Sequence, residues 1–259
     1  MTRIKNAFEN KKAFIPFITC GDPDVETTEK VVRSAVKAGA DLIELGIPFS
    51  DPTAEGPVIQ GANLRALTGG ITTDKVFDLV RSLRKDIDTP FVFMTYANLV
   101  YSYGAEKFMS LCRETGVDGI ILPDLPFEEK EEFKDVCEEY GVDLISLIAP
   151  TSSDRISMIA REAKGFIYLV SSLGVTGVRS EIKTDLSSIV KTIRENTDLP
   201  CAVGFGISTP EQAKKMAAVS DGAIVGSAII KLIEKYGKDS PSYVEGFIRE
   251  MADAVHSVS

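Results

Sequence analysis

Short β-rich runs alternate with longer amphipathic segments along the whole chain, and this alternation restricts the possible folds more than any other feature. Such alternation is typical of repeated βα units built around a parallel sheet. The expected strands are mostly apolar on both faces, as buried parallel strands should be. We count eight of them: Ala13–Thr19, Asp41–Gly46, Phe91–Tyr96, Gly119–Leu122, Asp143–Ile148, Gly165–Val170, Pro200–Gly204 and Gly222–Val225.

Helical patterns fill the intervals, and several are followed by Gly or Thr-Gly, where a helix should stop. They cover Thr27–Ala38, Thr73–Lys85, Ala105–Thr115, Glu128–Tyr140, Asp154–Ala163, Leu186–Glu195, Pro210–Ala217 and Ala228–Tyr236. A short helix near Arg3–Asn10 and a C-terminal helix over Ser242–Ser257 are expected outside the repeat. The irregular stretches Ile47–Ile71 and Ser171–Thr184 exceed the roughly 2–6 residues of an ordinary βα loop, so we expect them to act as lids.

Eight such units in 259 residues predict an α/β protein with a single (β/α)8 barrel domain over residues 1–259. No Pro-, Gly- or Ser-rich linker divides the chain. A doubly wound open sheet is the alternative. It is disfavoured because candidate functional loops follow nearly every strand, whereas an open sheet has one switch point.

The composition narrows the classes of partner and compartment. A formal net charge of -9 argues against general binding of nucleic acid or anionic membranes. No apolar run approaches the ~20 residues that span a bilayer, and the N-terminus lacks an apolar signal core, so we expect a cytoplasmic protein. The 4 cysteines form no C-x-x-C pair, which favours reduced thiols over disulfides or zinc.

The second expected strand carries a candidate catalytic acid. Its period of two places Leu42, Glu44 and Gly46 on one face, and Ile43 and Leu45 on the other. Because the apolar pair suits the helix layer, Glu44 is predicted to point into the barrel. An ionised carboxylate is expensive to bury there unless it is hydrogen-bonded or acts as an acid or base with a raised pKa. A purely structural carboxylate is the alternative.

The loop after this strand holds a second carboxylate at the predicted C-terminal mouth of the barrel, where catalytic loops lie. It packs three prolines, Asp51 and Glu55 into residues 48–57. Two carboxyl groups in different environments can divide an acid role from a base or orienting role. A solvated turn could look similar, and the sequence does not pair Glu44 with Glu55.

Glycine-bearing loops follow the sixth, seventh and eighth expected strands, at residues 174–177, 204–208 and 226–227. In (β/α)8 enzymes a phosphate commonly binds at the loops after strands seven and eight, where backbone N–H groups and a helix N-terminus contact it. Ser227 is placed as a helix cap or phosphate donor. Glycines that end strands for steric reasons are the alternative. No Walker-type lysine is present, so chemistry on nucleoside triphosphates is not expected.

Five motifs together resemble the tryptophan synthase α subunit family, along nearly the whole chain and in the family's order. The stretch Glu-Leu-Gly-Ile-Pro-Phe-Ser-Asp-Pro is highly specific. Related barrels such as phosphoribosyl-anthranilate isomerase and indole-glycerol-phosphate synthase lack its Pro-Phe-Ser-Asp-Pro loop. The motifs are Phe14–Pro23, Glu44–Pro52, Tyr96–Leu99, Gly174–Gly177 and Gly204–Ser208.

The resemblance implies retro-aldol cleavage of indole-3-glycerol phosphate to indole and glyceraldehyde 3-phosphate, with no cofactor or metal and with a β subunit as partner in an α2β2 complex. It makes Glu44 the general acid/base and Glu55 the second catalytic carboxylate. Substrate-lining positions are Phe17, Met94, Tyr96, Ile121, Tyr168 and Phe205, each of which could also be barrel filler. Phosphate positions are Gly177, Gly206, Gly226 and Ser227, and loop-closing positions are Asp51, Asn63 and Thr176.

One departure concerns the second carboxylate, because the family motif has Ala-Asp-Gly-Pro where this chain has Ala54-Glu-Gly-Pro57. The family's aspartate contacts the indole N–H and stabilises the cation formed on C3 protonation. An added methylene could move the carboxylate by ~1 Å, enough to cost on the order of 10²-fold in rate. A weakened α-like subunit that acts mainly as an allosteric partner of a β subunit is therefore the alternative. His256, the only histidine, lies on an expected surface helix and is given no catalytic or metal role.

Overall fold

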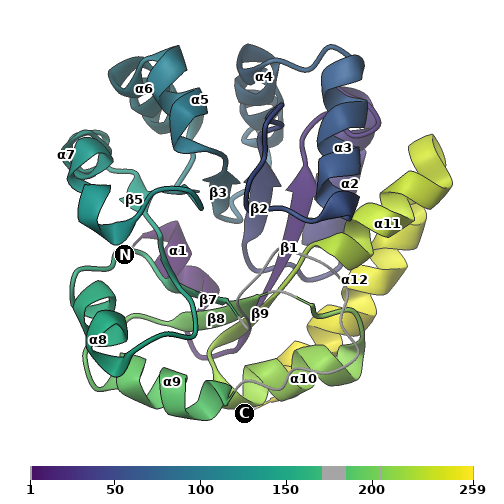
Figure 1. The fold of residues 1–259 in the computed structure, drawn as a ribbon. Coiled ribbons are helices and arrows are strands. Elements are labelled where there is room, and N and C mark those ends of the chain that lie inside the picture. The colour runs from purple at the N-terminus through teal and green to yellow at the C-terminus, as the bar shows by residue number, and fades with distance from the viewer. Residues whose placement is uncertain (1, 171–184, 205, 259) are drawn as a thin grey trace.

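The computed structural model describes residues 2–170, 185–204 and 206–258, and its strands form a nearly closed parallel barrel surrounded by helices (Figure 1). The strands are β1 (Ala13–Thr19), β2 (Ile43–Gly46), β3 (Phe91–Met94), β4 (Gly119–Ile121), β5 (Asp143–Leu144), β6 (Ser146–Ile148), β7 (Ile167–Val170), β8 (Cys201–Gly204) and β9 (Gly222–Val225). Their order in the sheet is β5-β4-β3-β2-β1-β9-β8-β7-β6. The expectation of a (β/α)8 barrel is confirmed, and the open-sheet alternative is wrong.

The helices surround this sheet, and each has an apolar face that packs inward. They are α1 (Arg3–Ala7), α2 (Val25–Lys37), α3 (Pro57–Thr68), α4 (Thr73–Leu83), α5 (Ala97–Tyr103), α6 (Ala105–Thr115), α7 (Glu131–Tyr140), α8 (Ser153–Arg161), α9 (Leu186–Arg194), α10 (Pro210–Val219), α11 (Ser227–Tyr236) and α12 (Ser240–His256), with short 3-10 turns η1 (Phe127–Glu129) and η2 (Gly237–Asp239). None of the helices in the described ranges is long and apolar enough to cross a membrane. All four cysteines are buried and unpaired.

The ring closes through the fifth expected strand, which is bent at Ile145. The first half of this segment, β5, pairs with β4, and the second half, β6, pairs with β7. The Ile145 N–H donates to the Ile120 carbonyl at 2.9 Å, so the bend keeps contact with β4. The eight expected segments are therefore all present, and one of them supplies two short strands.

The expectation that residues 47–71 are irregular is wrong for their second half, which forms helix α3. Pro57 occupies the first turn, where its missing N–H costs nothing. The buried residues of α3 recur at helical spacing, as Ile59, Ala62, Asn63 and Ala66. Only residues 47–56 remain as a loop after β2, and the second expected lid, 171–184, lies outside the described residues.

Other differences are smaller. Helix α5 was not expected; it begins directly after Tyr96, the first residue of one of the family motifs. The expected helix 128–140 is interrupted at Lys130, which separates η1 from α7. The N-terminal helix ends at Ala7, three residues before Asn10, whose φ of 59° is incompatible with a continuing helix.

Aspartates tie neighbouring strands together at the N-terminal end of the barrel. Each lies just before its own strand and accepts a hydrogen bond from the backbone N–H of an adjacent strand: Asp41 from Phe14 at 2.7 Å, Asp118 from Phe91 at 2.9 Å and Asp221 from Cys201 at 3.0 Å. The same carboxylates pair with cationic side chains. Backbone hydrogen bonds and ion pairs of these aspartates therefore hold this end of the barrel together.

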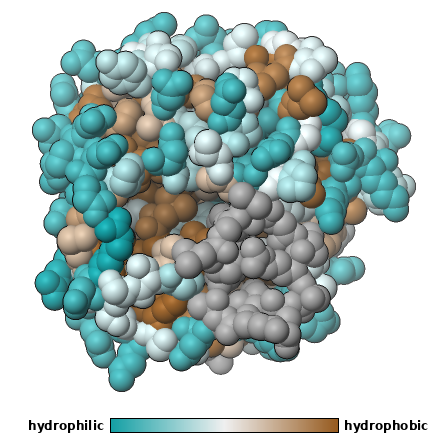
Figure 2. Space-filling model, viewed as in Figure 1, coloured by the Kyte–Doolittle hydropathy of each residue, from teal (hydrophilic) through white to brown (hydrophobic). Residues whose placement is uncertain are grey.

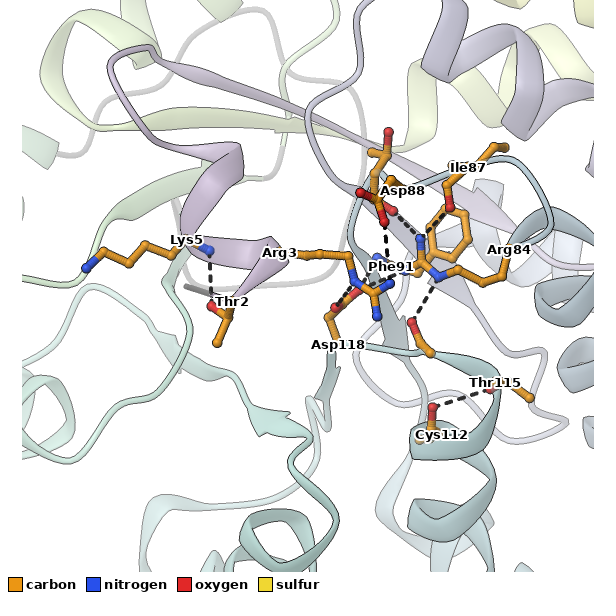
Figure 3. Close-up of polar contacts among 12 residues, drawn as sticks. Thr2, Arg3, Lys5, Arg84, Ile87, Asp88, Phe91, Cys112, Thr115 and Asp118 are labelled. Carbon is orange, nitrogen blue, oxygen red and sulfur yellow. Dashed lines mark hydrogen bonds and ion pairs between the residues drawn. The ribbon is translucent and has the colours of Figure 1, made fainter.

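The best-connected of these groups surrounds Asp118 (Figure 3). Arg84 Nη2 lies 2.8 Å from one carboxylate oxygen of Asp118, and Arg3 Nε lies 2.8 Å from the other. The Arg84 guanidinium also lies over the Phe91 ring, 3.9 Å from its centroid, and donates to the Ile87 carbonyl at 3.0 Å. These contacts join α1, α4 and β4, so the N-terminal helix is fixed to the base of the barrel.

The C-terminal helix α12 is fixed to the same end. Its last residue, His256, places Nε2 2.7 Å from Asp41 Oδ2, and Lys11 contacts the other oxygen of Asp41. The helix buries one face against α2 and β1, through Val244, Ile248 and Met251. His256 therefore has a structural contact at the opposite end of the barrel from the loops that follow the strands.

Candidate functional site

A cavity opens at the C-terminal mouth of the barrel, where the strands end and the βα loops begin. Figure 2 shows hydrophobic side chains in a hollow near the centre of the viewed face, with hydrophilic side chains around it. The cavity collects residues from loops and strands that are far apart in the sequence. Its lining residues are Phe17, Glu44, Ala54, Glu55, Ile59, Met94, Pro123, Leu147, Tyr168, Gly206, Ile207, Ile224, Gly226 and Ser227.

Glu44 lies inside the barrel, as the alternation of β2 predicts. It sits beside Phe17 of β1 and Val92 of β3 in the strand register, and only 1% of its surface is exposed. Burial, followed by the nearby charge of Glu55, raises the pKa of Glu44 to about 8. Its Oε2 has no hydrogen-bond partner among the described residues. At neutral pH this carboxyl is therefore largely protonated, which is the state of a proton donor.

Glu55 reaches the same cavity from the loop that precedes α3. Its carboxylate accepts a hydrogen bond from Asn63 Nδ2 at 2.7 Å, and its backbone carbonyl accepts one from Gln60 Nε2 at 2.7 Å. Burial raises the pKa of Glu55 to about 7, against the opposing effect of the Asn63 hydrogen bond. The two carboxyl groups that the sequence left unpaired thus share one cavity, and the pKa of each lies near neutrality.

Two glycines make room for the aromatic walls of the cavity. A Cβ on Gly46 would lie 2.5 Å from Cζ of Phe17, and a Cβ on Gly204 would lie 2.4 Å from the Tyr168 hydroxyl oxygen. Both distances are shorter than any real contact, so these strand positions accept only glycine while the rings stay in place. Met94 completes the apolar part of the predicted set that lines the cavity.

The predicted phosphate residues that the structure describes also line this cavity. Gly226 precedes α11 and Ser227 is its first residue, so free backbone N–H groups of the first turn lie at the cavity wall. Gly206 joins them from the loop after β8. The described lining residues include no Lys or Arg, so an anion would be held by backbone N–H groups, the Ser227 hydroxyl and the helix dipole.

Tyr96 and Ile121 are buried but are not among the lining residues. The Tyr96 hydroxyl instead accepts a hydrogen bond from the Ala54 N–H at 3.0 Å, and its ring stacks on Phe49 with centroids 5.1 Å apart. Tyr96 therefore supports the loop that carries Glu55.

The predicted loop-closing residues are dispersed. Asp51 is exposed and accepts a hydrogen bond from the Ser50 hydroxyl, whereas Asn63 is buried and holds Glu55. Thr176, Gly177 and Phe205 lie outside the described residues.

Sequence reasoning missed several lining residues. Ile59 was missed because its helix was taken for a loop, and Leu147 because the expected strand Asp143–Ile148 was given no site residue. The period of two in that strand could have indicated Leu147, whereas the amphipathic pattern of α3 is a weak signal for Ile59. The others are Ala54, Pro123, Ile207 and Ile224.

Comparison with known proteins gives the family of this barrel. A family model described as tryptophan synthase alpha chain matches residues 4–256. The chain belongs to the tryptophan synthase alpha chain family. A tryptophan synthase alpha chain from Lacticaseibacillus casei is 49% identical over 98% of this chain and 96% of its own length. One from Lactiplantibacillus plantarum is 48% identical over 98% of this chain and 97% of its own length.

Solved structures of tryptophan synthase alpha chains share the whole fold. The subunit from Legionella pneumophila superposes with a TM-score of 0.90 at 39% identity, covering 100% of both chains. A chain from the tryptophan synthase α2β2 complex of Pyrococcus furiosus gives a TM-score of 0.85 at 34% identity, covering 94% of this chain and 99% of the other. Membership of the family supports the main functional interpretation, and nothing in these comparisons favours the weakened allosteric subunit.

Proposed function

We propose that this chain is a carbon–carbon lyase that cleaves indole-3-glycerol phosphate to indole and glyceraldehyde 3-phosphate. One observation carries the proposal: a buried carboxyl with a pKa of about 8, Glu44, faces the same cavity as the first turn of α11. A proton donor and an anion site in one cavity match a substrate that must be protonated at carbon and held by its phosphate.

Glu44 serves as the acid and then as the base. In its protonated state it donates to C3 of the indole ring, which weakens the bond between C3 and the glycerol chain. The resulting carboxylate then accepts the proton of the adjacent glycerol hydroxyl as the carbon–carbon bond breaks and the aldehyde forms. The raised pKa favours the first step, because the neutral form is available near pH 7.

Glu55 stabilises the cation that C3 protonation creates. Its carboxylate would accept a hydrogen bond from the indole N–H, whose charge grows in the transition state. Asn63 and Gln60 fix both ends of this residue, which limits the freedom that the longer side chain adds. The preorganised contact supports a catalytic role for Glu55 in place of aspartate.

The substrate would lie with its ring among Phe17, Met94 and Tyr168 and its phosphate at Gly206, Gly226 and Ser227. The Pyrococcus furiosus structure is that of a tryptophan synthase α2β2 complex with mutual activation. By this similarity the present chain would assemble with a β subunit, which would receive the indole.

The experiment follows indole release by the purified chain from indole-3-glycerol phosphate, first alone and then with a β subunit added. We expect indole and glyceraldehyde 3-phosphate in equal amounts, with faster release in the presence of the partner. Failure to release indole under either condition would refute the proposal.

A further inference from the structure

We propose that Arg65 is a positioning residue for this lyase reaction: it clamps α3 between the loop after β1 and helix α11, and so holds Glu55 at the cavity. The inference rests on the proposed function, since it assigns Arg65 a part in the same reaction. Arg65 itself does not line the cavity.

The first arm of the clamp is a two-point contact with Asp22, which follows β1. Arg65 Nε lies 2.8 Å from Asp22 Oδ1, and Arg65 Nη2 lies 2.9 Å from Asp22 Oδ2. Asp22 is 0% exposed. A buried carboxylate needs a partner of fixed geometry, and a guanidinium that contacts both oxygens fixes angle as well as distance. The position of α3 relative to β1 is thereby set.

The second arm reaches α11, the helix whose first turn lines the cavity. Arg65 Nη1 lies 2.9 Å from Glu234 Oε1. Glu234 is on the last turns of α11, and α3 packs directly against this helix. One guanidinium therefore joins the loop after β1, helix α3 and helix α11.

Helix α3 transmits this position to Glu55. Asn63, two residues before Arg65 on the same helix, donates to the Glu55 carboxylate, and Gln60 donates to the Glu55 carbonyl. A shift of α3 would move both contacts together. Because catalytic contacts tolerate displacements of well under ~1 Å, a contact made outside the cavity can control the position of the Glu55 carboxylate within it.

Arg33 provides a control arginine on another part of the barrel. Its Nη1 contacts both oxygens of Asp86, at 2.8 and 2.7 Å, through a single nitrogen, and Arg33 also pairs with Glu29 at 2.9 Å. The two arginine side chains are similarly exposed, 35% for Arg33 and 30% for Arg65, but Asp86 is exposed whereas Asp22 is buried. Arg33 lies on α2, which contributes no residue to the cavity lining.

The test replaces each arginine by lysine, which keeps the charge but loses the two-nitrogen fork that Arg65 presents to Asp22. We expect R65K to lower kcat for indole release by about tenfold with KM changed less than about threefold, and R33K to change neither by more than about twofold. In an Asn63→Ala background, R65K should cost less than about twofold more, because the contact between α3 and the Glu55 carboxylate is already broken and only the Gln60 contact to the Glu55 backbone remains. If R65K lowers kcat about tenfold in the Asn63→Ala background as well, Arg65 does not act through Asn63.

The outcomes separate this inference from the proposed function. If the unmodified chain releases indole and R65K retains full kcat, only the clamp is wrong. If the unmodified chain releases none with its partner, the proposed function fails and the clamp with it. If thermal unfolding shows that R65K is not folded, Glu234→Gln is the substitute variant. It weakens only the exposed contact between Arg65 and α11. It should then lower kcat about threefold, the size expected of a partly exposed ion pair, and unchanged kcat would overturn the clamp.

Discussion

Carboxyl groups at the two ends of the barrel have opposite surroundings. At the N-terminal end, Asp41, Asp118 and Asp221 each accept a backbone N–H and contact at least two cationic or imidazole side chains. At the C-terminal mouth, Glu44 has no cationic partner among the described residues and one oxygen without a hydrogen bond. The carboxyl group is therefore paired with cationic or imidazole side chains at one end of the barrel and lacks a cationic partner at the other.

The difference separates carboxylates that are held in ion pairs from the carboxyl group to which the proposed reaction assigns the proton transfer. The carboxylates at the base join strands and helices through their ion pairs and backbone hydrogen bonds. Glu44 pays for its burial by holding a proton near neutral pH, which makes that proton available to a substrate.

The largest effect is expected from Glu44→Gln. The amide keeps the shape of the side chain but carries no transferable proton, so kcat for indole release should fall on the order of 10³-fold. The far-UV circular dichroism spectrum should stay that of the unmodified chain. Steady-state kinetics of indole release measure the effect, and activity within tenfold of the original would remove Glu44 from the mechanism.

Asp118→Asn should lower the stability of the fold and leave kcat almost unchanged, in contrast to Glu44→Gln. The amide oxygen can still accept the Phe91 N–H, but Arg84 and Arg3 lose their counter-charge. Since the Arg84 and Asp118 side chains are only 11% and 10% exposed, the free energy of unfolding should fall by about 3 kcal/mol. Denaturant titration measures this loss. Indole release per folded molecule should change less than about twofold; a large fall in kcat would erase the contrast between the two ends.

Glu55→Ala tests whether the longer carboxylate works at the mouth. Removal of the carboxylate leaves the indole N–H without its acceptor, so kcat should fall on the order of 10²-fold. Asn63 loses its partner as well, so Asn63→Ala is the control that removes this hydrogen bond but keeps the Glu55 carboxyl group. Ordinary turnover in the unmodified chain together with this loss would show that the loop adapts to glutamate. An unchanged kcat in Glu55→Ala would mean that the Glu55 carboxylate has no part in the reaction.

The smallest effect concerns stability and pH. Burial raises the pKa of Glu44 from 4.5 to about 8, so between these values the folded chain binds more protons than the unfolded chain. The free energy of unfolding must then fall as pH rises through this window. Relative to Glu44→Gln, the unmodified chain should lose on the order of 2 kcal/mol between pH 6 and pH 8. Parallel stability curves for the two proteins would contradict the raised pKa.

The sequence predicted those parts of the site that depend on local periodicity. The period of two in β2 is sufficient to point Glu44 inward, because the helix layer takes Ile43 and Leu45. The glycines before α11 likewise indicate an anion site from their position in the repeat. The barrel itself follows from eight repeats of one pattern.

The missed parts depend on tertiary packing. Helix α3 follows a loop rich in proline, and two of its buried positions are alanines, so its amphipathic pattern is weak and its stability comes from α11 and β1. The contact between Asn63 and Glu55 could not be expected without that helix. The bend at Ile145 is equally invisible, because it reflects the requirement that two different neighbours pair with one segment.

That bend also affects the behaviour of the chain in a crowded solution. An open sheet ends in strands whose free N–H and C=O groups can recruit another molecule, which is a common start of aggregation. Here the two ends of the ladder, β5 and β6, are halves of one continuous segment. Gly165 lies against Asp143, where an added Cβ would come 3.2 Å from the Asp143 Cβ. The sheet therefore has no separate edge strand at this point with which a strand of another molecule could pair.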